Sequence, residues 1–531
     1  MRARGNAGCP EHDHQYARPV VPAGRTVIRD WPDTSTTNAV LLRPRHDLVA
    51  EDLVAELARS GTGTQVFEQR HGPFQQYRRE VSRHGSGWRE TTHYRLLIPW
   101  MGWVFALPVR WYLGRGRAPR RHAGPARSSN PWWAPPDRLD ERQTLVLGLL
   151  AAASMSSAFI NTVFTQTVAF AADDFGVGSS GIGVAGSVVR AGIVLALPAA
   201  VLADRIGRKR VITIVAWAAP LATAVGAFAP SFALLVATQT IGRPLGLALG
   251  FLIAVVAAEE VPRSSRAYAV SLLAMASGLG AGVAVLALPL ADLAQGSWRF
   301  IFLVTLVWLP VAVDIARRLP ETTRFQLRPT EPPRLDRRRF AVLAIVAVAT
   351  NTFVSPASFF QNAYLLDVRE YSGASIAVFT LATATPAGLG LLLGGKLADL
   401  RGRRRLLAVA LPLSTAFIVV SYSVPGAPMW ASAFVGGFLG SMAYPALAVY
   451  RAELFPTGNR GRVAGLLTAS ALLGGIGGLL LAGVLLDGTW SYGQVMGLLA
   501  LAQVVVVIVV LAAYPETAHR SLEDLNPSDT R

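Results

Sequence analysis

The stretch that decides the fold is Leu202-Ala-Asp204-Arg205-Ile-Gly207-Arg208-Lys209-Arg210, a short charged loop between two long apolar segments. A second copy, Asp399-Leu-Arg-Gly402-Arg403-Arg-Arg405, follows at an offset of 195 residues. Either loop alone is compatible with a simple patch of charge at the end of a membrane helix. The repetition at a fixed distance indicates that a larger unit of the chain is duplicated.

Two further motifs recur at nearly the same distance. Glu259-x-x-Pro262-x-x-x-Arg266 is matched by Glu453-x-x-Pro456-x-x-x-Arg460 at an offset of 194, and Pro320-Glu321-Thr322 by Pro515-Glu516-Thr517 at 195. Three signals in register make coincidence a poor explanation. Two related halves are a known transporter architecture, in which the substrate site lies near the middle of the membrane between them.

The composition agrees with a membrane protein. Of 531 residues, 52% are hydrophobic and 16% are charged, against about 25% charged in an average soluble domain. A helix needs about 20 apolar residues to cross the hydrocarbon core. Twelve such segments follow Gln143: 143–172, 178–203, 210–229, 232–258, 266–294, 298–318, 340–366, 373–398, 405–424, 428–452, 461–486 and 491–514. The sequence therefore predicts an all-α membrane protein, with twelve transmembrane helices in two pseudo-symmetric six-helix bundles after an N-terminal cytoplasmic extension.

Basic residues predict the orientation in the membrane. The even-numbered loops and the central loop are rich in arginine, whereas the opposite loops offer only Arg299 and Arg369. Because positive residues stay inside, we expect a multi-pass protein of the cell membrane with both termini in the cytoplasm. The net charge of +17 lies in these loops, so no nucleic-acid partner is expected. The single cysteine, Cys9, excludes an intramolecular disulfide, and no signal peptide is recognisable.

The first 142 residues are less regular. Residues 47–58 have the apolar spacing of one amphipathic helix. Residues 96–113 are apolar but contain Pro99, Pro108 and Arg110, which favours an interfacial or re-entrant segment over a true span. The predicted parts are a soluble extension (1–95), an interfacial segment with a basic tether (96–142), the first bundle (143–318), a central loop (319–339), the second bundle (340–514) and a tail (515–531).

Residues 143–525 resemble the major facilitator superfamily. The loop at 202–210 looks like that family's signature between helices 2 and 3, and its copy like the echo between helices 8 and 9. Arg243, in Gln239-Thr-Ile-Gly242-Arg243-Pro-Leu-Gly246, resembles the family's buried arginine on helix 4. Pro320-Glu-Thr-Thr-Arg324 and Pro515-Glu-Thr-Ala-His-Arg520 resemble motifs of sugar porters and metabolite:proton symporters. The chain departs from sugar porters at Thr350-Asn351-Thr352, which lacks their paired glutamines, and from drug antiporters at Ser277-Gly278-Leu-Gly280.

We interpret the charged loops as a cytoplasmic gate. The resemblance implies an ion-pair network that forms when the protein faces out and breaks when it faces in; the alternative is that these charges only fix topology. The gate residues are Asp204, Arg205, Gly207, Arg208, Glu259, Arg266, Glu321, Asp399, Gly402, Arg403, Glu453, Arg460 and Glu516.

Charged side chains within membrane helices are costly and usually functional. Arg190 and Arg243 lie well inside the second and fourth segments, and together they favour an anionic solute. Asp173 and Asp174 end the first segment and suit either a proton switch or a helix cap. The further candidates for the pathway are polar residues on helices 1, 4, 7 and 10: Asn161, Gln166, Asn351, Gln361, Asn362 and Tyr444.

These features predict a secondary transporter of a small solute, coupled to protons, working in the lipid bilayer as a monomer. Gly390-Leu-Leu-Leu-Gly394-Gly395-Lys396 matches part of a P-loop, but Leu397 replaces the serine or threonine, so no ATP site is expected. Neither a cofactor nor a metal site nor an enzyme activity is predicted. The alternatives are a drug or metabolite exporter, and a transporter-like sensor without net flux.

Overall fold

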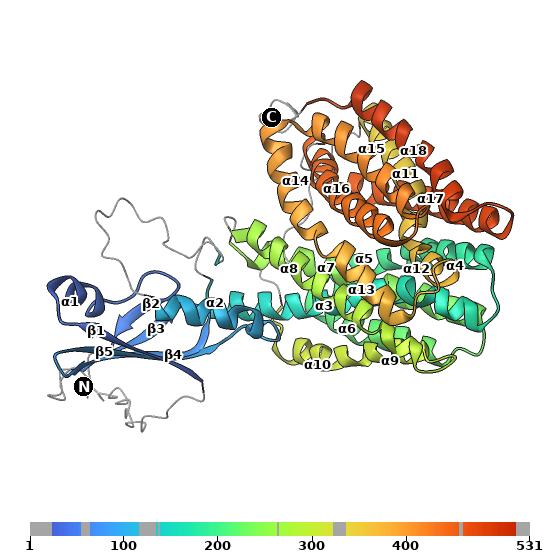
Figure 1. The fold of residues 1–531 in the computed structure, drawn as a ribbon. Helices are drawn as coiled ribbons and strands as arrows, with labels where there is room; N and C mark the ends of the chain where they lie inside the picture. The colour runs from blue at the N-terminus through green and yellow to red at the C-terminus, as the bar shows by residue number, and fades with distance from the viewer. Residues whose placement is uncertain are drawn as a thin grey trace, which may run out of the picture. The chain divides into compact units, whose positions relative to one another are not determined.

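The computed structural model describes residues 24–54, 64–115, 134–135, 139–262, 265–321, 336–455 and 460–516. The chain forms two compact units, residues 1–148 and residues 149–531 (Figure 1). We call them the N-terminal unit and the membrane unit and treat each by itself.

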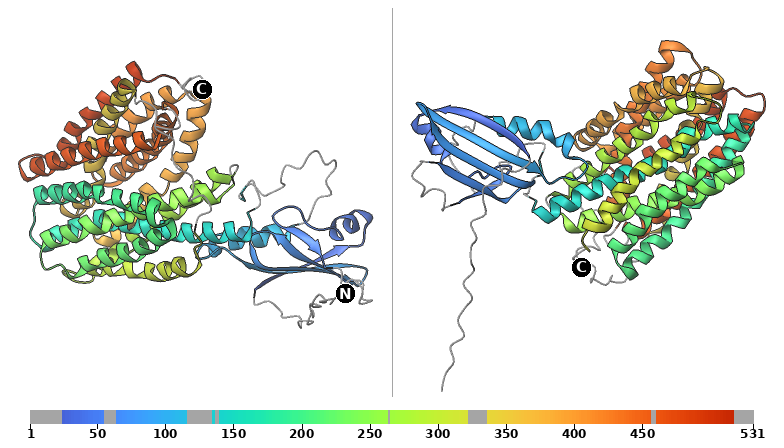
Figure 2. Two further views of the ribbon diagram at one scale, coloured as in Figure 1. Left: turned by 180° about the vertical axis from the view of Figure 1, so that it is seen from behind. Right: turned by 90° about the horizontal axis from the view of Figure 1, so that it is seen from below.

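The N-terminal unit is built on one antiparallel sheet of five strands in the order β1-β5-β4-β3-β2. The strands are β1 (Arg25–Pro32), β2 (Ala50–Leu53), β3 (Gln65–His71), β4 (Phe74–His84) and β5 (Gly87–Leu96), with a short helix α1 (Ser35–Leu41) after β1. Helix α2 (Gly102–Gly114) packs on the sheet (Figure 2). Leu48, Phe74 and Tyr94 form the core beneath it with Val109 and Leu113 of the helix.

The helix predicted over residues 47–58 is wrong. Residues 50–53 form strand β2, and residues 55–58 lie outside the described part of the chain. An alternation of hydrophobic residues does not predict these strands, because several of their inward-facing positions are polar. Glu51, Arg79, Glu90 and Thr92 are all buried. Burial therefore alternates along β4 and β5 while hydrophobicity does not.

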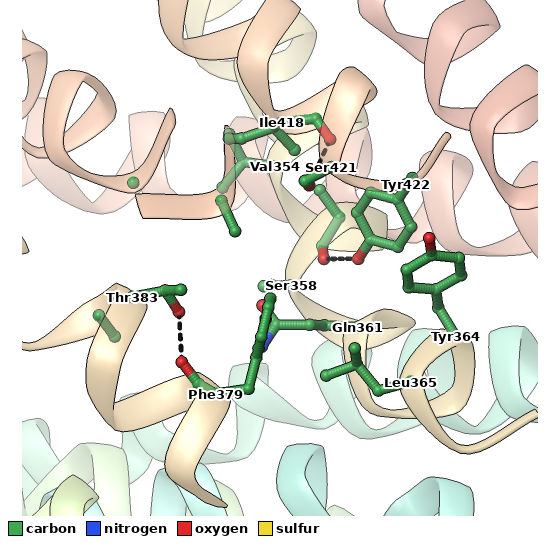
Figure 3. Close-up of a pocket in the computed structure, with 14 residues that line it drawn as sticks. Val354, Ser358, Gln361, Tyr364, Leu365, Phe379, Thr383, Ile418, Ser421 and Tyr422 are labelled. Carbon is green, nitrogen blue, oxygen red and sulfur yellow. Dashed lines mark hydrogen bonds between the residues drawn. The ribbon is translucent and has the colours of Figure 1, made fainter. Parts of the chain in front are cut away.

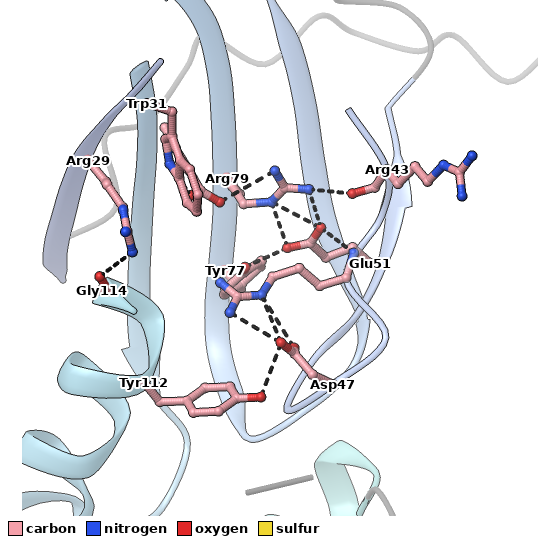
Figure 4. Close-up of polar contacts among 11 residues, drawn as sticks. Arg29, Trp31, Arg43, Asp47, Glu51, Tyr77, Arg79, Tyr112 and Gly114 are labelled. Carbon is pink, nitrogen blue, oxygen red and sulfur yellow. Dashed lines mark hydrogen bonds and ion pairs between the residues drawn. The ribbon is translucent and has the colours of Figure 1, made fainter. Parts of the chain in front are cut away.

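Those buried charges pair with one another (Figure 4). Arg79 donates from Nη2 to Glu51 at 2.6 Å and to the carbonyl oxygen of Arg43 at 3.0 Å, and from Nη1 to the carbonyl oxygen of Leu41 at 3.0 Å. Tyr77 donates to Glu51 at 2.6 Å. Arg45 pairs with Asp47, which also accepts a hydrogen bond from Tyr112 of α2. Buried polar side chains thus connect β2, β4 and α2.

Helix α2 has two apolar sides. Val109 and Leu113 are buried on the sheet, whereas Trp103, Leu107 and Trp111 are exposed. Its 13 residues rise about 20 Å, less than the roughly 30 Å of a hydrocarbon core. The spanning alternative for residues 96–113 is therefore not what the structure has, while contact of the exposed side with a membrane surface stays a prediction.

In the membrane unit, eleven helices of the described chain are long and apolar enough to cross a membrane. The first half contains α3 (Glu141–Asp174), α4 (Ser179–Ala191), η2 (Gly192–Ala196), α5 (Leu197–Ile206), α6 (Arg208–Ala224), η3 (Val225–Phe228), α7 (Phe232–Glu260), α8 (Arg266–Leu286), η5 (Leu288–Asp292), α9 (Arg299–Leu303), η6 (Val304–Trp308) and α10 (Leu309–Arg318), where η marks a 3₁₀ turn.

The second half repeats this arrangement. It contains α11 (Arg337–Phe359), α12 (Gln361–Asp367), α13 (Gly373–Ala384), α14 (Ala387–Arg401), α15 (Arg403–Ser421), α16 (Gly426–Glu453), α17 (Arg460–Asp487) and α18 (Tyr492–Ala513). The predicted segment 428–452 is α16, a helix of 28 residues that is not among the eleven apolar spans. Each predicted segment therefore corresponds to helix, and the predicted fold class is confirmed.

The second helix of each half is broken midway, between α4 and α5 and again at Pro386 between α13 and α14. At one end of the unit the halves are in contact, because α4 packs along α17 and α13 packs on η5. Toward the end that carries the loops at 204–210 and 399–405, α5 packs on α6 and α7, and α14 on α15 and α16, all within their own halves. Figure 1 shows the halves together around α4, α12 and α13. We call the two ends the contact end and the arginine-rich end.

Candidate functional site

At the arginine-rich end, Glu321 closes the N-terminus of α6. Its Oε1 accepts hydrogen bonds from the backbone nitrogens of Arg208, at 2.9 Å, and Lys209, at 3.2 Å. These amides have no partner within the helix, and the helix dipole favours a negative charge there. The sequence placed Glu321 in the gate as an ion-pair partner; the structure assigns it to backbone amides.

The second half repeats the arrangement. Glu516 accepts from the backbone nitrogens of Arg403 at 3.0 Å and Arg404 at 3.2 Å, at the start of α15. Gly207 and Gly402 precede the two helices with φ of +102° and +96°, a backbone conformation that only glycine adopts readily. A Cβ on either glycine would lie 2.7 Å from the glutamate oxygen. Both caps thus place a glutamate on the first two amides of the helix, Glu321 through one oxygen and Glu516 through both.

One of the expected ion pairs is present at this end: Arg208 pairs with Glu259 of α7, within the first half. Arg205 is exposed at the end of α5, and Arg403 is buried. The side chains of the other predicted gate residues lie outside what the structure describes: Asp204, Arg266, Asp399, Glu453 and Arg460. The bonds described so far join parts of one half, so a gate network between the halves stays a prediction.

Arg190 and Arg243 lie in the middle of the first half. Arg190 is near the end of α4, directly before the break in the helix, and Arg243 precedes Pro244 inside α7. The Nε atoms of both side chains and Nη1 of Arg243 are buried. Within the described part of the chain neither guanidinium forms a hydrogen bond or an ion pair. Arg190 is close enough for its charge to act on Arg243.

Arg190 also reaches the second half. A Cβ on Gly475 of α17 would lie 3.2 Å from its Nη1 and 2.7 Å from the hydroxyl oxygen of Ser355 on α11. That hydroxyl is likewise buried without a partner in the described structure. Ser355 and Gly475 are not among the residues that the sequence predicts for the pathway. Two guanidinium groups and a hydroxyl beside a glycine form a set of donors suited to an anion.

Asp174 is held away from these arginines. Its carboxylate pairs with Arg299 at 2.9 Å and accepts from Nε1 of Trp298 at 3.1 Å, so it ties the end of α3 to the start of α9 at the contact end. Asp173 lies beside it, and its charge acts on Asp367 of the second half. The pair thus combines a fixed carboxylate with one near the boundary between the halves.

The predicted polar residues divide into two groups. Asn161 and Asn351 donate to carbonyl oxygens one turn earlier on their own helices, at 2.8 Å and 3.0 Å. Asn362 instead donates to Gln166 across the two halves, at 2.8 Å to the carbonyl oxygen and 2.9 Å to Oε1. Tyr444 is exposed on α16. Among these candidates, Gln166 and Asn362 are the two that hydrogen-bond to each other in the described part of the chain.

Gln361 lines a cavity of about 200 Å³ inside the second half (Figure 3). The wall is mainly apolar and comes from α11, α12, α13, α15 and α16. Two of its hydroxyls bond the backbone: Thr383 donates to the carbonyl oxygen of Phe379 and Tyr422 to that of Ala357. None of the described residues that line the cavity is charged, and no pattern in the sequence indicated the wall formed by α15.

Two stretches of the chain, residues 146–385 and 340–528, match the sequence model of the Major Facilitator Superfamily, and together they cover more than half of the chain. The chain belongs to the major facilitator superfamily. It is thus a secondary transporter of small solutes by family. No curated protein sequence matches the chain.

Solved structures of superfamily members have the same fold. A bacterial homologue of the human lysosomal transporter Spinster, inward-facing and unoccupied, matches with a TM-score of 0.57 and 19% identity, over 70% of this chain and 95% of that one. The inward-open xylose transporter XylE from E. coli gives 0.57 and 16%, over 72% and 98%. The human organic anion transporter MFSD10 gives 0.51 and 16%, over 69% and 99%. At these identities the likeness concerns the fold.

Proposed function

We propose that this superfamily member moves a small organic anion across the cell membrane by alternating access, coupled to protons. The main evidence for an anionic solute is the pair of buried arginines, Arg190 and Arg243. An unpaired charge within a membrane protein costs several kcal/mol, roughly, and two like charges side by side cost more. A bound carboxylate or phosphate offsets that cost, because it accepts from both guanidinium groups.

The position of the arginines suits a pathway between the halves. Arg190 belongs to the first half, yet its guanidinium lies next to Ser355 and Gly475 of the second. A solute bound there touches both halves and can therefore respond to their relative movement. The α-helix also changes to a 3₁₀ turn directly after Arg190, at Gly192–Ala196.

The distribution of basic loops supports an orientation with both termini in the cytoplasm. In that orientation the contact end faces outward and the arginine-rich end faces the cytoplasm, so the structure corresponds to an inward-facing state. Asp173 and Asp174 are the candidates for proton coupling, because a carboxylate that loses its arginine partner binds a proton more readily. The charged loops remain our candidates for the cytoplasmic gate.

The deciding experiment is uptake by purified protein in proteoliposomes, with a panel of carboxylates, sugars and amphipathic cations, each with and without a pH gradient. We expect accumulation of an anion that the gradient increases. Gradient-driven extrusion from the lumen identifies an exporter, and binding without flux identifies a sensor. Preference for a sugar or a cation over every anion contradicts the role given to the two arginines.

Coupling has its own test. Replacing Asp173 and Asp174 by asparagine is expected to abolish gradient-driven uptake while sparing exchange of labelled for unlabelled solute, because exchange needs no net proton movement. Gradient-driven uptake at the wild-type rate would remove both residues from the coupling role.

A further inference from the structure

The contact end holds two carboxylates at equivalent places in the repeat. Asp292 ends the fifth helix of the first half, and Asp487 ends the corresponding α17 of the second half, 195 residues later. Each lies at the start of a helix from the other half. Asp292 meets α13 at Gly373, and Asp487 meets α4 at Gly178, which is again 195 residues earlier than Gly373.

Asp292 binds the N-terminus of α13 directly. Its Oδ1 accepts from the backbone nitrogen of Gly373 at 2.6 Å, and its Oδ2 from that of Ala374 at 2.8 Å. Both amides belong to the first turn, where no intrahelical partner exists. The bonds are charge-assisted and parallel to the helix dipole, which favours an anion at this position.

Asp487 lies at the equivalent place beside the start of α4, although within the described structure no hydrogen bond joins it to that helix. Its two oxygens lie 2.9 Å and 3.4 Å from the point that a Cβ on Gly178 would occupy. Helices α4 and α17 are in direct backbone contact near Asp487, since a Cβ on Gly183 of α4 would lie 2.4 Å from the carbonyl oxygen of Leu479 on α17. Gly373 leaves equally little room, because its Cβ would lie 2.5 Å from the carbonyl oxygen of Leu288. The glycines allow the carboxylates to reach the helix starts.

We propose that Asp292 and Asp487 act as a symmetric pair that holds the contact end closed, Asp292 by capping α13 and Asp487 by placing its negative charge beside the N-terminus of α4. The proposal rests on alternating access as part of the proposed function. Opening the contact end must break the cap of Asp292 and move Asp487 away from the start of α4. The carboxylates and the freed amides then bind water, so the pair adjusts the balance between the two states and leaves each half folded.

The arginine-rich end offers the contrast that makes the proposal specific. There, Glu321 and Glu516 cap helices of their own halves, so those bonds survive a movement of one half against the other. A carboxylate at a helix N-terminus thus stabilises one half at the arginine-rich end, and it joins the two halves at the contact end.

The test uses a buried reporter between the halves. Ser187 on α4 is 5% exposed and donates to the carbonyl oxygen of Ile476 on α17 at 3.2 Å. In a Cys9→Ser background, Ser187→Cys reacts with a bulky thiol reagent only when α4 and α17 separate. The labelling rate in nanodiscs, where both faces are accessible, therefore measures the open population even when that population is small.

We expect Asp292→Asn or Asp487→Asn to increase the labelling rate about threefold, and the double variant about tenfold, since each removes one charge from a helix start. Gly373→Ala is expected to act in the same direction by crowding Leu288. The matched control is Asp336→Asn. Asp336 caps α11 through the amides of Arg338 and Arg339, at 3.0 Å and 3.1 Å, within one half. Its replacement is expected to leave the rate unchanged.

A second measurement covers the case in which the reporter disturbs packing. Spin labels at Pro230→Cys and Ala427→Cys, both exposed at the contact end in different halves, report their separation. We expect longer distances to gain weight in the double variant. Labelling and distances equal to those of the Asp336→Asn control would overturn the proposal. Neither readout needs a substrate or a gradient, so a protein that opens as expected but transports nothing contradicts the proposed function alone.

Discussion

Two groups of buried arginines differ in what surrounds them. In the N-terminal unit, Arg79 is fully buried and meets Glu51, Glu90 and two carbonyl oxygens, and Arg45 meets Asp47. In the membrane unit, Arg190 and Arg243 have no such partner within the described structure.

The difference separates structure from function. A paired buried charge satisfies its neighbours, so removing one partner leaves the other stranded. An unpaired buried charge does not stabilise the fold, and it is tolerated where a ligand supplies the missing partner. The two groups should therefore respond to substitution in opposite ways: the paired arginines through stability, the unpaired ones through transport.

The largest effect is expected at Arg79. Arg79→Leu leaves Glu51 buried without a cation, which lowers the free energy of unfolding of the N-terminal unit by about 3–5 kcal/mol. Hydrogen exchange at the amides of β4 and β5 in the intact protein measures the loss. Arg83→Leu is the matched control, because its pair with Asp33 is largely exposed and contributes little. Unchanged exchange in Arg79→Leu contradicts the structural role.

The next effect concerns Arg243. Arg243→Gln removes a donor and a charge from the anion site, and uptake is expected to fall about 100-fold, the scale of losing one partner of a buried charge pair. The melting temperature should stay the same or rise, because an unpaired buried charge is gone. Arg317→Gln, at an exposed position of α10, controls for the change in net charge. Normal uptake by Arg243→Gln, or a large drop in its melting temperature, contradicts the proposed difference between paired and unpaired arginines.

A smaller effect is expected for Arg190→Lys. The charge remains, but the planar fork that reaches Ser355 and Gly475 is lost, so the apparent affinity for the anion should fall about tenfold. Measuring uptake against solute concentration separates affinity from maximal rate. The comparison variant is Arg190→Gln, which removes the charge as well. If Arg190→Lys lowers the apparent affinity as much as Arg190→Gln does, binding depends on the shape of the guanidinium group. If Arg190→Lys leaves the affinity unchanged, binding depends on the charge alone.

The smallest effect belongs to the rim of the paired network. Tyr112→Phe removes one hydrogen bond to Asp47, at 3.3 Å, while Asp47 keeps Arg45. The expected loss is about 1 kcal/mol, the net value of one such bond. Exchange at the amides of α2 measures it. A loss comparable to that of Arg79→Leu means that α2 and the sheet depend on this single contact.

The membrane unit could be predicted well because its helices are long and apolar and because charged motifs repeat at 194 or 195 residues. The family and the twelve helices followed from these two features. The sheet could not be predicted, since Glu51, Arg79 and Glu90 occupy positions where a pattern of hydrophobicity expects apolar side chains. Pairing across strands is a property of the folded state and leaves no local signal.

The candidate site was predicted in part. Arg190 and Arg243 were found because charge inside an apolar segment is conspicuous, and Glu321 and Glu516 because their motif repeats. Ser355, Gly475, Asp292 and Gly373 were missed: each is ordinary in its own segment and acquires a role only through a neighbour far away in the chain.

The caps formed by Glu321 and Glu516 have a consequence for how the protein is made. Glu321 follows its helix in the chain, so the first half can close its own cap before the ribosome has produced any helix of the second. The second half does the same with Glu516 at its own end. A gene cut between Glu321 and Asp336 and expressed as two polypeptides should therefore yield two halves that fold separately and need each other only at the contact end.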